Sequence, residues 1–429
     1  MSLLHSSSHP ALTSSVDLFS LPPTNTTVDY SLYGEYQPVV NIQDCSSKID
    51  FKIPANGAHY LDLFDSFLYL KVIVTNKDGT DLADGEDVSP VNCFLHALFS
   101  QVDVYLTSQL VSTSNNAYAY RALIETLLSC GDDHRLSQGG CYMSYYDTNG
   151  GVADDTNHGY KTRKNYIARS RKLELIDKLR FDLANQHRYI LNDVSVTISL
   201  TRSPDAFALV TGTNKEFKIK ILKASYYVRK QVLYPSIILA HQRLLEKGHV
   251  AKYPHKRTHV KYFTIANGNS GAVEENLFNG SIPARIVVAL LSSSAFNGNF
   301  QENPLTFKHY DLRSIGLTVN NIPVPVQLNF DSDEYLLAYY LLFTSTGIAN
   351  QDSGIGIERN AFKRTYPMFA FDIVQGTSNN ALLDLNKSGS VRLELKFGKA
   401  LPEALHCVIY SEHQGLLEID KFRQIVNTE

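Results

Sequence analysis

The sequence predicts an all-β protein of two tandem eight-stranded jelly rolls, a double jelly roll, with a few short helices. Short apolar runs with strand-like alternation recur along the chain, helical patterns are few, and the second half repeats the first in order. Many short strands with few helices favour a sandwich or jelly roll over an α/β sheet, which alternates strands with helices. An immunoglobulin-like pair fits less well, because each half has roughly 200 residues, about twice that domain's usual length.

The repeat pairs segments of the two halves in the same order. The pairs are 51–57 with 263–268, 68–74 with 285–290, 102–106 with 315–319, 114–128 with 331–343, 181–183 with 371–373, and 194–200 with 391–397. Their offset is about 212 residues at first and about 190 at the end, far longer than the period of a solenoid. We therefore expect two similar all-β domains that lie head to tail in the sequence.

Composition and turn signals divide the chain into four parts. Residues 1–28 are rich in Ser, Thr and Pro and are expected to form a flexible N-terminal arm. The first jelly roll is assigned to 29–232, and it includes a long loop, 130–172, rich in Gly, Asp and Tyr. A connector with a helix is assigned to 233–258, and the second jelly roll to 259–429.

Strands are predicted where apolar residues occupy every second position. The clearest case is 194–200, where Val, Ile and Leu alternate with Ser and Thr. This spacing places one face of a strand in a core and the other in water. Similar patterns predict strands at 66–75, 217–228, 391–397 and 405–410.

Three helices are predicted from start signals that precede apolar residues at helical spacing. Ser114 is expected to cap the helix in 114–128, and the acidic residues 331–334 are expected to cap its counterpart in the second half. A third helix, 235–247, has Pro in its first turn and Gly directly after its end. It has no counterpart in the first half, so we assign it to the connector.

Composition also argues against several classes of protein. The net charge of −3 disfavours a chain whose main role is to coat nucleic acid. Five cysteines without a C-x-x-C pair are expected to be reduced core thiols of a soluble protein made inside the cell. The N-terminus lacks the pattern of a signal peptide, and no apolar run approaches the ~18 residues needed for a membrane-spanning segment.

No pattern amounts to a catalytic, cofactor-binding or metal-binding site, so we expect a protein that is not an enzyme and binds no cofactor. Gly354 and Gly356 lack the third glycine of a dinucleotide loop and predict a turn. His249, His255 and His259 have no carboxylate or Cys at ligand spacing, and nearby Lys and Arg residues oppose a metal cation. A solvated or interface-facing loop is the expected place for these histidines.

Two acidic clusters and one basic stretch have similar ordinary interpretations. Asp331, Asp333 and Glu334 resemble a site for acid–base chemistry or Ca²⁺, but helix capping explains them more simply. Residues 132–134, Asp-Asp-His, are expected at the surface. The basic stretch 161–188 could contact nucleic-acid phosphates or anionic neighbours, or act as a weak nuclear-import signal, but we favour a solvated or subunit-contacting loop.

Several short phrases, spread from about residue 30 to residue 420, resemble one known family in their order. The chain is similar to the double jelly-roll major capsid proteins of Polinton/Maverick elements and adintoviruses, and to related capsid-like genes in animal genomes. The matching phrases are Tyr60-Leu-Asp-Leu63, Val91-Asn92, Leu95-His96-Ala-Leu-Phe99, Tyr118-Ala-Tyr-Arg121-Ala-Leu-Ile-Glu125, Ala251-Lys-Tyr-Pro254, Ala295-Phe-Asn-Gly298, Asn303-Pro304 and Leu401-Pro-Glu403.

This resemblance implies a structural function and specific partners. Three chains would form a homotrimer, a capsomer of pseudo-hexagonal outline, and capsomers would tile an icosahedral shell around double-stranded DNA. The implied partners are neighbouring capsomers, a single jelly-roll penton protein, and packaged DNA through non-specific contacts at most. The implied location is the virion, with assembly in the nucleus or the cytoplasm left open. The loop 130–172 would be a tower or a trimer clasp, and the N-terminal arm would contact the underside of the shell.

Two alternatives from other functional classes remain behind the capsid hypothesis. A cupin-like two-barrel enzyme would need an H-x-H motif with a downstream Glu and His, and the chain has no H-x-H. A carbohydrate-binding jelly roll is expected to use Trp on its binding face, and the chain has no Trp.

Overall fold

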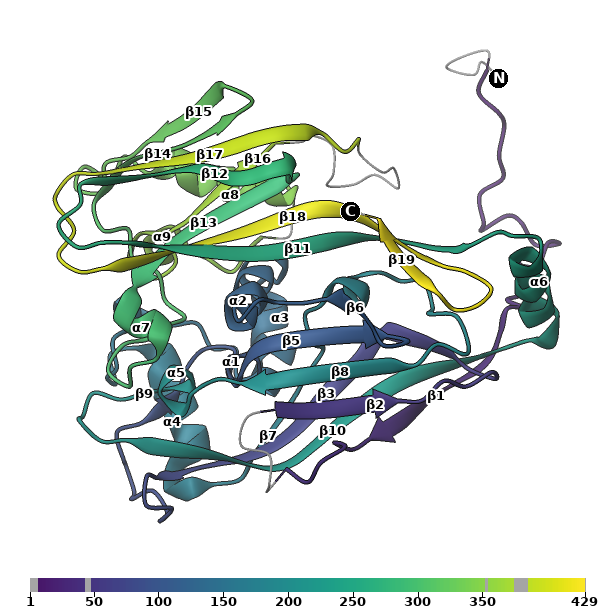
Figure 1. Cartoon of the computed structure of the whole chain (residues 1–429), viewed down its shortest axis with the longest axis horizontal. Helices are drawn as coiled ribbons and strands as arrows, with labels where there is room; N and C mark the ends of the chain where they lie inside the picture. Colours follow the sequence, from purple (N-terminus) through teal and green to yellow (C-terminus); the bar gives the residue numbers. More distant parts are fainter. Residues whose placement is uncertain (1–6, 43–47, 352–353, 374–384, 429) are drawn as a thin grey trace.

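The strands form two β-sandwiches that follow one another along the chain (Figure 1). The computed structural model describes residues 7–42, 48–351, 354–373 and 385–428. One sheet of the first sandwich has the order β1 (Val28–Tyr36), β10 (Phe217–Leu233), β3 (Tyr60–Asn76), β7 (Leu173–Asp177). The facing sheet has the order β2 (Lys48–Ile53), β8 (Val196–Arg202), β5 (Phe99–Leu106), β6 (Gln109–Ser112).

The second sandwich repeats this topology. One sheet has the order β11 (Ala251–Ile265), β18 (Leu405–Ile419), β13 (Arg285–Ser292), β16 (Met368–Asp372), and β19 (Ile425–Thr428) also pairs with β18. The facing sheet has the order β12 (Gly271–Ser281), β17 (Ser388–Phe397), β14 (Leu312–Val319), β15 (Ile322–Gln327). A small pair, β4 (Ser89–Pro90) and β9 (Leu209–Val210), lies outside both sandwiches. Each half has two antiparallel sheets, of four strands each in the first half and of five and four strands in the second, so the predicted double jelly roll is confirmed.

The internal repeat is confirmed for four of the six segment pairs. Equivalent strands or helices contain 68–74 and 285–290, 102–106 and 315–319, 114–128 and 331–343, and 194–200 and 391–397. The pairing of 51–57 with 263–268 is wrong, because the former ends β2, the second strand of its roll, and the latter ends β11, the first. The pair 181–183 and 371–373 also falls on different elements, since only 371–373 includes residues of a strand.

The equivalent hairpins of the two rolls turn in the same way. Thr107 and Ser108 connect β5 to β6 with φ angles of 46° and 69°, and Asn320 and Asn321 connect β14 to β15 with φ angles of 49° and 66°. Two consecutive positive φ angles give the turn whose twist matches that of the flanking strands. Asn adopts this conformation readily, whereas Thr and Ser do so at a cost.

The predicted helices exist, but two of their predicted caps do not. The helices are α1 (Phe94–Ala97), α2 (Tyr118–Ser129), α3 (Asp132–Leu136), α4 (His158–Ile167), α5 (Asp205–Ala208), α6 (Pro235–Glu246), α7 (Ser293–Asn297), α8 (Leu336–Thr346) and α9 (Arg359–Arg364). Ala117 and Tyr335 occupy the N-cap positions of α2 and α8, without a side-chain cap. Ser114 instead accepts a hydrogen bond from the backbone N–H of Val102, at 2.7 Å. A strand neighbour in the fold thus competes successfully for the side chain that the local pattern assigned to the helix.

The predicted long loop 130–172 contains more regular structure than expected. It includes α3, α4 and the short 3-10 helices η1 (Gln138–Tyr142), η2 (Asn149–Gly151) and η3 (Ala168–Ser170). Its many Gly, Asp and Asn residues supply turns between these short helices, which explains why the sequence resembled an irregular loop.

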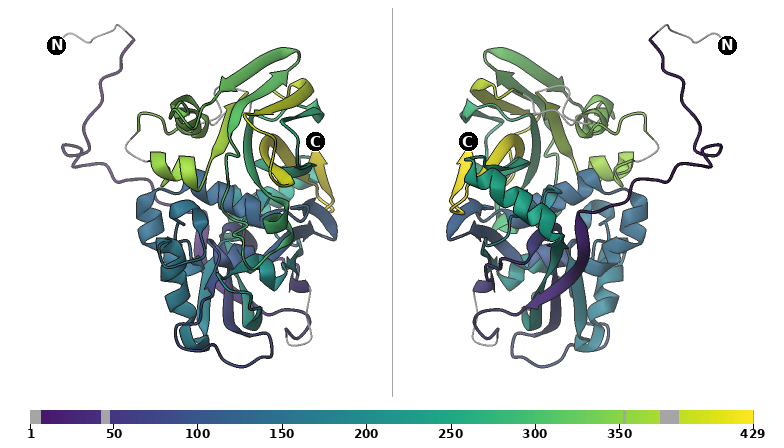
Figure 2. Two further views of the ribbon diagram at one scale, coloured as in Figure 1. Left: turned by 90° about the vertical axis from the view of Figure 1, so that its left-hand side faces the viewer. Right: turned by 90° about the vertical axis from the view of Figure 1, so that its right-hand side faces the viewer.

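The connector helix α6 lies where it was predicted, but the strand after it starts early. β11 begins at Ala251, inside the range 233–258 that was assigned to the connector. Its residues 252–255, Lys, Tyr, Pro and His, do not show the apolar alternation of a strand, yet they pair with residues 415–418 of β18. Before β1, residues 7–27 form neither helix nor strand and extend away from the sandwiches, and Phe19 is 99% exposed (Figure 2).

The corresponding central strands of the two rolls differ in how they are buried. From Phe67 to Val74, β3 alternates between half-buried and fully buried side chains, as in a sheet with one outward face. All the residues of β13 after Arg285 are buried. The sheet of β13 is therefore covered on both faces, and α2 of the first roll packs against β11 and β18 of this sheet.

Candidate functional site

The most extensive arrangement of buried polar groups lies between the two jelly rolls. On α2, the Arg121 side chain is 1% exposed and donates to Glu125 Oε1 at 2.9 Å and to Asp182 Oδ1 at 2.8 Å. Asp182 Oδ1 also accepts the backbone N–H of Thr258, at 3.2 Å, from β11 of the second roll. Burial disfavours the charge of Arg121, but Glu125 and Asp182 outweigh burial and raise its pKa. One ion-pair network thus joins the two rolls.

A second buried network joins the segment 130–172 to the second roll. The Asp147 carboxylate accepts from Arg163 Nη2 at 2.5 Å, Asn157 Nδ2 at 2.9 Å and Asn303 Nδ2 at 3.0 Å. The Asp147 backbone N–H donates to Tyr366 Oη at 3.0 Å. Both side chains of the Asp147–Arg163 pair are fully buried. The segment that was predicted to be a tower or a trimer clasp is therefore in contact with the second roll of its own chain.

Aromatic stacking supports the same boundary. Tyr120 of α2 stacks on Phe296 of α7, with ring centroids 5.4 Å apart and nearly parallel planes. Phe296 stacks in turn on His406, at 4.1 Å. Arg121, Asp147 and Tyr120 were not identified as important from the sequence. For Arg121 the sequence did contain a signal. A charged residue within the apolar helix pattern of 118–128 usually indicates a buried ion pair.

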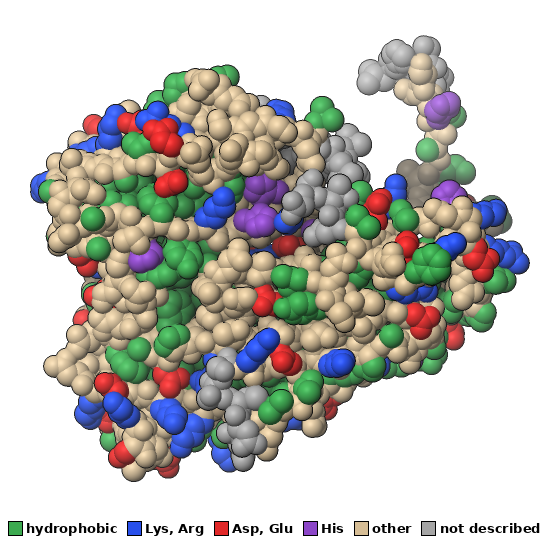
Figure 3. Space-filling view, in the orientation of Figure 1, with side chains coloured by type: hydrophobic (Ala, Val, Ile, Leu, Met, Phe, Trp, Pro, Cys, Tyr) green, Lys and Arg blue, Asp and Glu red, His purple; other side chains and the backbone are tan. Residues whose placement is uncertain are grey.

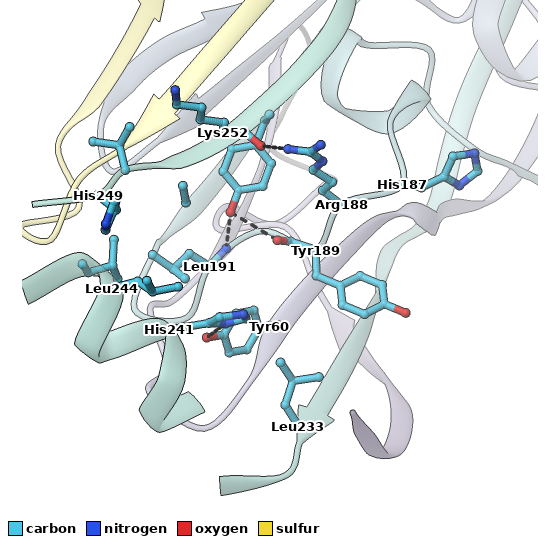
Figure 4. Close-up of a pocket in the computed structure, with 14 residues that line it drawn as sticks. Tyr60, His187, Arg188, Tyr189, Leu191, Leu233, His241, Leu244, His249 and Lys252 are labelled. Carbon is cyan, nitrogen blue, oxygen red and sulfur yellow. Dashed lines mark hydrogen bonds between the residues drawn. The ribbon is translucent and has the colours of Figure 1, made fainter. Parts of the chain in front are cut away.

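A cavity of about 440 Å³ lies beside the connector helix α6 (Figure 4). Tyr253 accepts the backbone N–H of Leu191 at 3.1 Å and donates to the carbonyl of Tyr189 at 3.2 Å. Tyr60 Oη and His241 Nδ1 are 3.0 Å apart. The lining holds no carboxylate and no thiol, so it lacks the paired acid and base or the activated nucleophile of most hydrolytic sites.

The three singled-out histidines do not form a metal site. His249 lines the cavity, and His255 lies buried in β11 with Nδ1 3.0 Å from the carbonyl of Tyr253. His259 packs against His413 instead, with ring centroids 5.3 Å apart. In the part of the chain that the structure describes, no three His, Cys, Asp or Glu side chains are placed to hold a metal ion.

The pair of His259 and His413 lies in a cationic and partly buried environment. Burial, together with repulsion from His259, Arg257 and Lys261, lowers the pKa of His413 to about 4. Burial and Arg257 likewise lower the pKa of His259. Figure 3 shows histidine side chains gathered near the middle of one face, between the two halves. Because the pKa of each is lowered, the His259 and His413 rings are neutral at pH 7.

The acidic clusters are held in separate ion pairs. Asp331 accepts from Arg313 at 2.8 Å, and Asp333 pairs with Lys363. These contacts replace the helix cap that the sequence predicted. Asp132 pairs with Arg135 at 2.8 Å within α3. Gly354 and Gly356 lie outside helices and strands, in agreement with the predicted turn.

The basic stretch 161–188 is not a uniform cationic surface. Arg163 is buried, and Arg180 and Lys164 form ion pairs in which both cations are mostly buried. Lys178 lies over the ring of Phe64, 4.1 Å from its centroid. Much of the positive charge is therefore neutralised or buried within the chain, which reduces its availability for phosphate groups.

The described cysteines have different environments. Cys93 and Cys407 are buried, Cys130 is intermediate and Cys141 is exposed, while Cys45 lies outside the described residues. Burial raises the pKa of Cys93 to about 12. Core thiols are thus found at two positions, and Cys141 differs from the prediction. Among the described residues, no helix is both long and apolar enough to cross a membrane.

Comparison with known proteins identifies the fold over the whole chain. No family model matches it. An uncharacterised protein of Caenorhabditis elegans is 24% identical over 423 residues, which cover 94% of this chain and 98% of that protein. A chain of the Sputnik virophage, solved by cryo-EM, superposes with a TM-score of 0.65 at 11% identity over 100% of this chain and 94% of that one.

Two further solved structures show the same likeness. The mavirus major capsid protein has a TM-score of 0.53 at 11% identity and covers 100% of this chain and 97% of its own. The Faustovirus major capsid protein has a TM-score of 0.55 at 8% identity, with coverage of 95% and 92%. The chain therefore has the double jelly-roll fold of these viral capsid structures.

Proposed function

We propose that this chain is a major capsid protein of the Polinton/Maverick–adintovirus type, with a structural and not a catalytic role. Three copies form a homotrimeric, pseudo-hexagonal capsomer, and capsomers tile an icosahedral shell around double-stranded DNA. The observation that carries this proposal is the tandem pair of jelly rolls with one topology, which superposes over its full length on a virophage chain.

The physical argument concerns symmetry. Six similar sandwiches from three chains approximate six-fold packing, while each chain keeps two distinct halves for different contacts. The polar and aromatic networks around Arg121, Asp147 and Tyr120 hold the two sandwiches of one chain together. A tile with fixed internal geometry is what a regular shell requires.

The proposed partners are neighbouring capsomers, a single jelly-roll penton protein and packaged DNA. Contact with DNA is proposed to be non-specific, since the net charge is −3 and much of the basic stretch 161–188 is neutralised internally. The proposed location is the capsid of the virion. The nematode relative of similar length supports a relation of this chain to capsid-like genes in animal genomes.

The test is the mass of the purified full chain in solution, measured by light scattering after size exclusion over a concentration series. The expected result is a species of three times 48.0 kDa, or shell-sized particles with capsomers of hexagonal outline in negative-stain images. A protein that stays monomeric at every concentration, with and without a crowding agent, would overturn the proposal.

A further inference from the structure

Helix α8 has an apolar surface that its own chain leaves uncovered. Its sequence from Leu336 to Phe343 is apolar at every position, although Leu336, Leu337 and Tyr340 are 53%, 58% and 48% exposed. A helix that is apolar on all sides is normally covered on all sides. We name these three exposed residues the α8 face.

The equivalent helix of the first roll shows what covers such a surface. α2 and α8 follow equivalent hairpins, and α2 begins at Tyr118 as α8 begins at Leu336. Tyr118, Ala119 and Ala122 of α2 are at most 3% exposed. α2 packs against β5 of its own roll and against β11 and β18 of the second roll. The cover of α2 therefore includes two adjacent strands of the second jelly roll.

The strands that correspond to β11 and β18 in the first roll are β1 and β10, and their outward surface is uncovered. Tyr33 of β1 is 50% exposed and lies 5.5 Å from the ring of Phe67, which stacks at 5.1 Å on Tyr227 of β10. Ile176 of β7, in register with Tyr69 on the same surface, is 40% exposed. We name Tyr33, Phe67, Tyr227 and Ile176 the Tyr33 face.

The two faces lie on different halves of the molecule. α8 belongs to the second half, and β1, β10, β3 and β7 form one sheet of the first sandwich (Figure 1). They are different surfaces, so they cannot pair by a two-fold axis that matches one patch with itself. They can pair head to tail, which produces a closed ring when the rotation closes.

We infer that the α8 face of one copy packs against the Tyr33 face of a second copy. This contact repeats between chains the contact that α2 makes with β11 and β18 within a chain. Because each chain carries one face of each kind, three copies close a ring in which internal and external contacts alternate. This inference rests on the proposed capsomer and names the surfaces that build it.

The test compares two charge variants and their mixture with the full-length protein. Leu337→Glu/Tyr340→Glu changes the α8 face, and Tyr33→Glu/Ile176→Glu changes the Tyr33 face. All four side chains are exposed in the single chain, so each variant should keep the wild-type far-UV circular dichroism and melting temperature. Each variant alone is expected to be monomeric, with assembly at least about 100-fold weaker than wild type, because charges then enter an apolar contact.

The mixture of the two variants distinguishes head-to-tail pairing from other arrangements. Each variant retains one intact face, so a 1:1 mixture forms one competent contact and should give a dimer of twice 48.0 kDa. The control is Leu239→Glu on α6, a side chain 47% exposed and outside both faces, which should assemble like wild type.

Each result has a definite meaning. Trimers of the α8-face variant, or a mixture that stays monomeric, overturn the inference but leave the proposed function intact if the wild type forms trimers. A wild type that is monomeric throughout overturns the proposed function, and with it this inference.

Discussion

The buried ion pair of Asp147 and Arg163 allows a quantitative prediction. Asp147→Ala leaves the Arg163 guanidinium fully buried, with the carbonyl of Pro90 as a remaining acceptor at 2.7 Å. Removing one partner of a buried pair costs about 3–5 kcal/mol, since the other charge stays desolvated. The change also removes the acceptor of Asn303 and one of the two acceptors of Asn157. We expect the local free energy of opening around residues 144–167 to fall by about that amount.

Native-state hydrogen exchange measures this local free energy without assuming that two domains unfold together. Amides in peptides that cover α4 should exchange about 150- to 5,000-fold faster in Asp147→Ala than in wild type. The matched control is Asp84→Ala, which removes an exposed pair with Arg169 and should leave the exchange unchanged. Exchange of α4 amides within twofold of wild type in Asp147→Ala would refute the reasoning.

Three further predictions concern single positions. Ser108→Gly should raise the melting temperature, with a gain of about 1 kcal/mol, because Ser108 has a φ of 69° that glycine adopts without strain; an unchanged or lower value contradicts this. The pKa of His413 is lowered from 6.5 to about 4, so its contribution to stability is complete above pH 6.5 and is lost as the pH falls toward 4. Between pH 7 and pH 4.5, the free energy of unfolding measured by chemical denaturation should fall less for His413→Gln than for wild type. Equal decreases would exclude this contribution of His413 to the pH dependence of stability. A maleimide should modify the exposed Cys141 much faster than Cys93, as followed by peptide mass spectrometry; comparable rates would mean that the Cys93 environment opens readily.

Strand alternation and length were sufficient to predict the double jelly roll. The runs 194–200 and 391–397 lie in the equivalent strands β8 and β17, because a half-buried sheet imposes the same period of two wherever it occurs. The equivalence of α2 and α8 was also visible, since the hairpin before each helix repeats. These are local signals that tertiary contacts do not override.

The errors arose where a local pattern has more than one structural use. An apolar strand end followed by Asn-Gly ends many strands, so 51–57 and 263–268 matched without being equivalent. Ser114 and Asp331 resembled helix caps, but β5 and Arg313 provide competing hydrogen-bond partners from elsewhere in the fold. A single sequence contains no information on which of these partners lies nearby.

The interface between the rolls was predictable only in outline. Arg121 was visible as a charge within an apolar helix, yet its partner Asp182 comes from a distant segment, as does Thr258, whose backbone N–H also donates to Asp182. The buried role of Arg163 was hidden within a stretch that is basic overall. Sequence patterns report the neighbours of a residue along the chain, whereas a buried pair depends on its neighbours in space.

The two-sided burial of β13 has a consequence for the order of synthesis. Domains generally fold from the N-terminus as the chain emerges from the ribosome. The first roll is therefore already made when the second roll emerges, and its sheet with β3 has an outward face of half-buried side chains. The second roll contains β13, a strand whose side chains are buried after Arg285. Until its sheet is covered, apolar side chains of this sheet are exposed and can aggregate. The order of the two rolls in the chain therefore means that α2 is present before the strands β11 and β18 that it packs against.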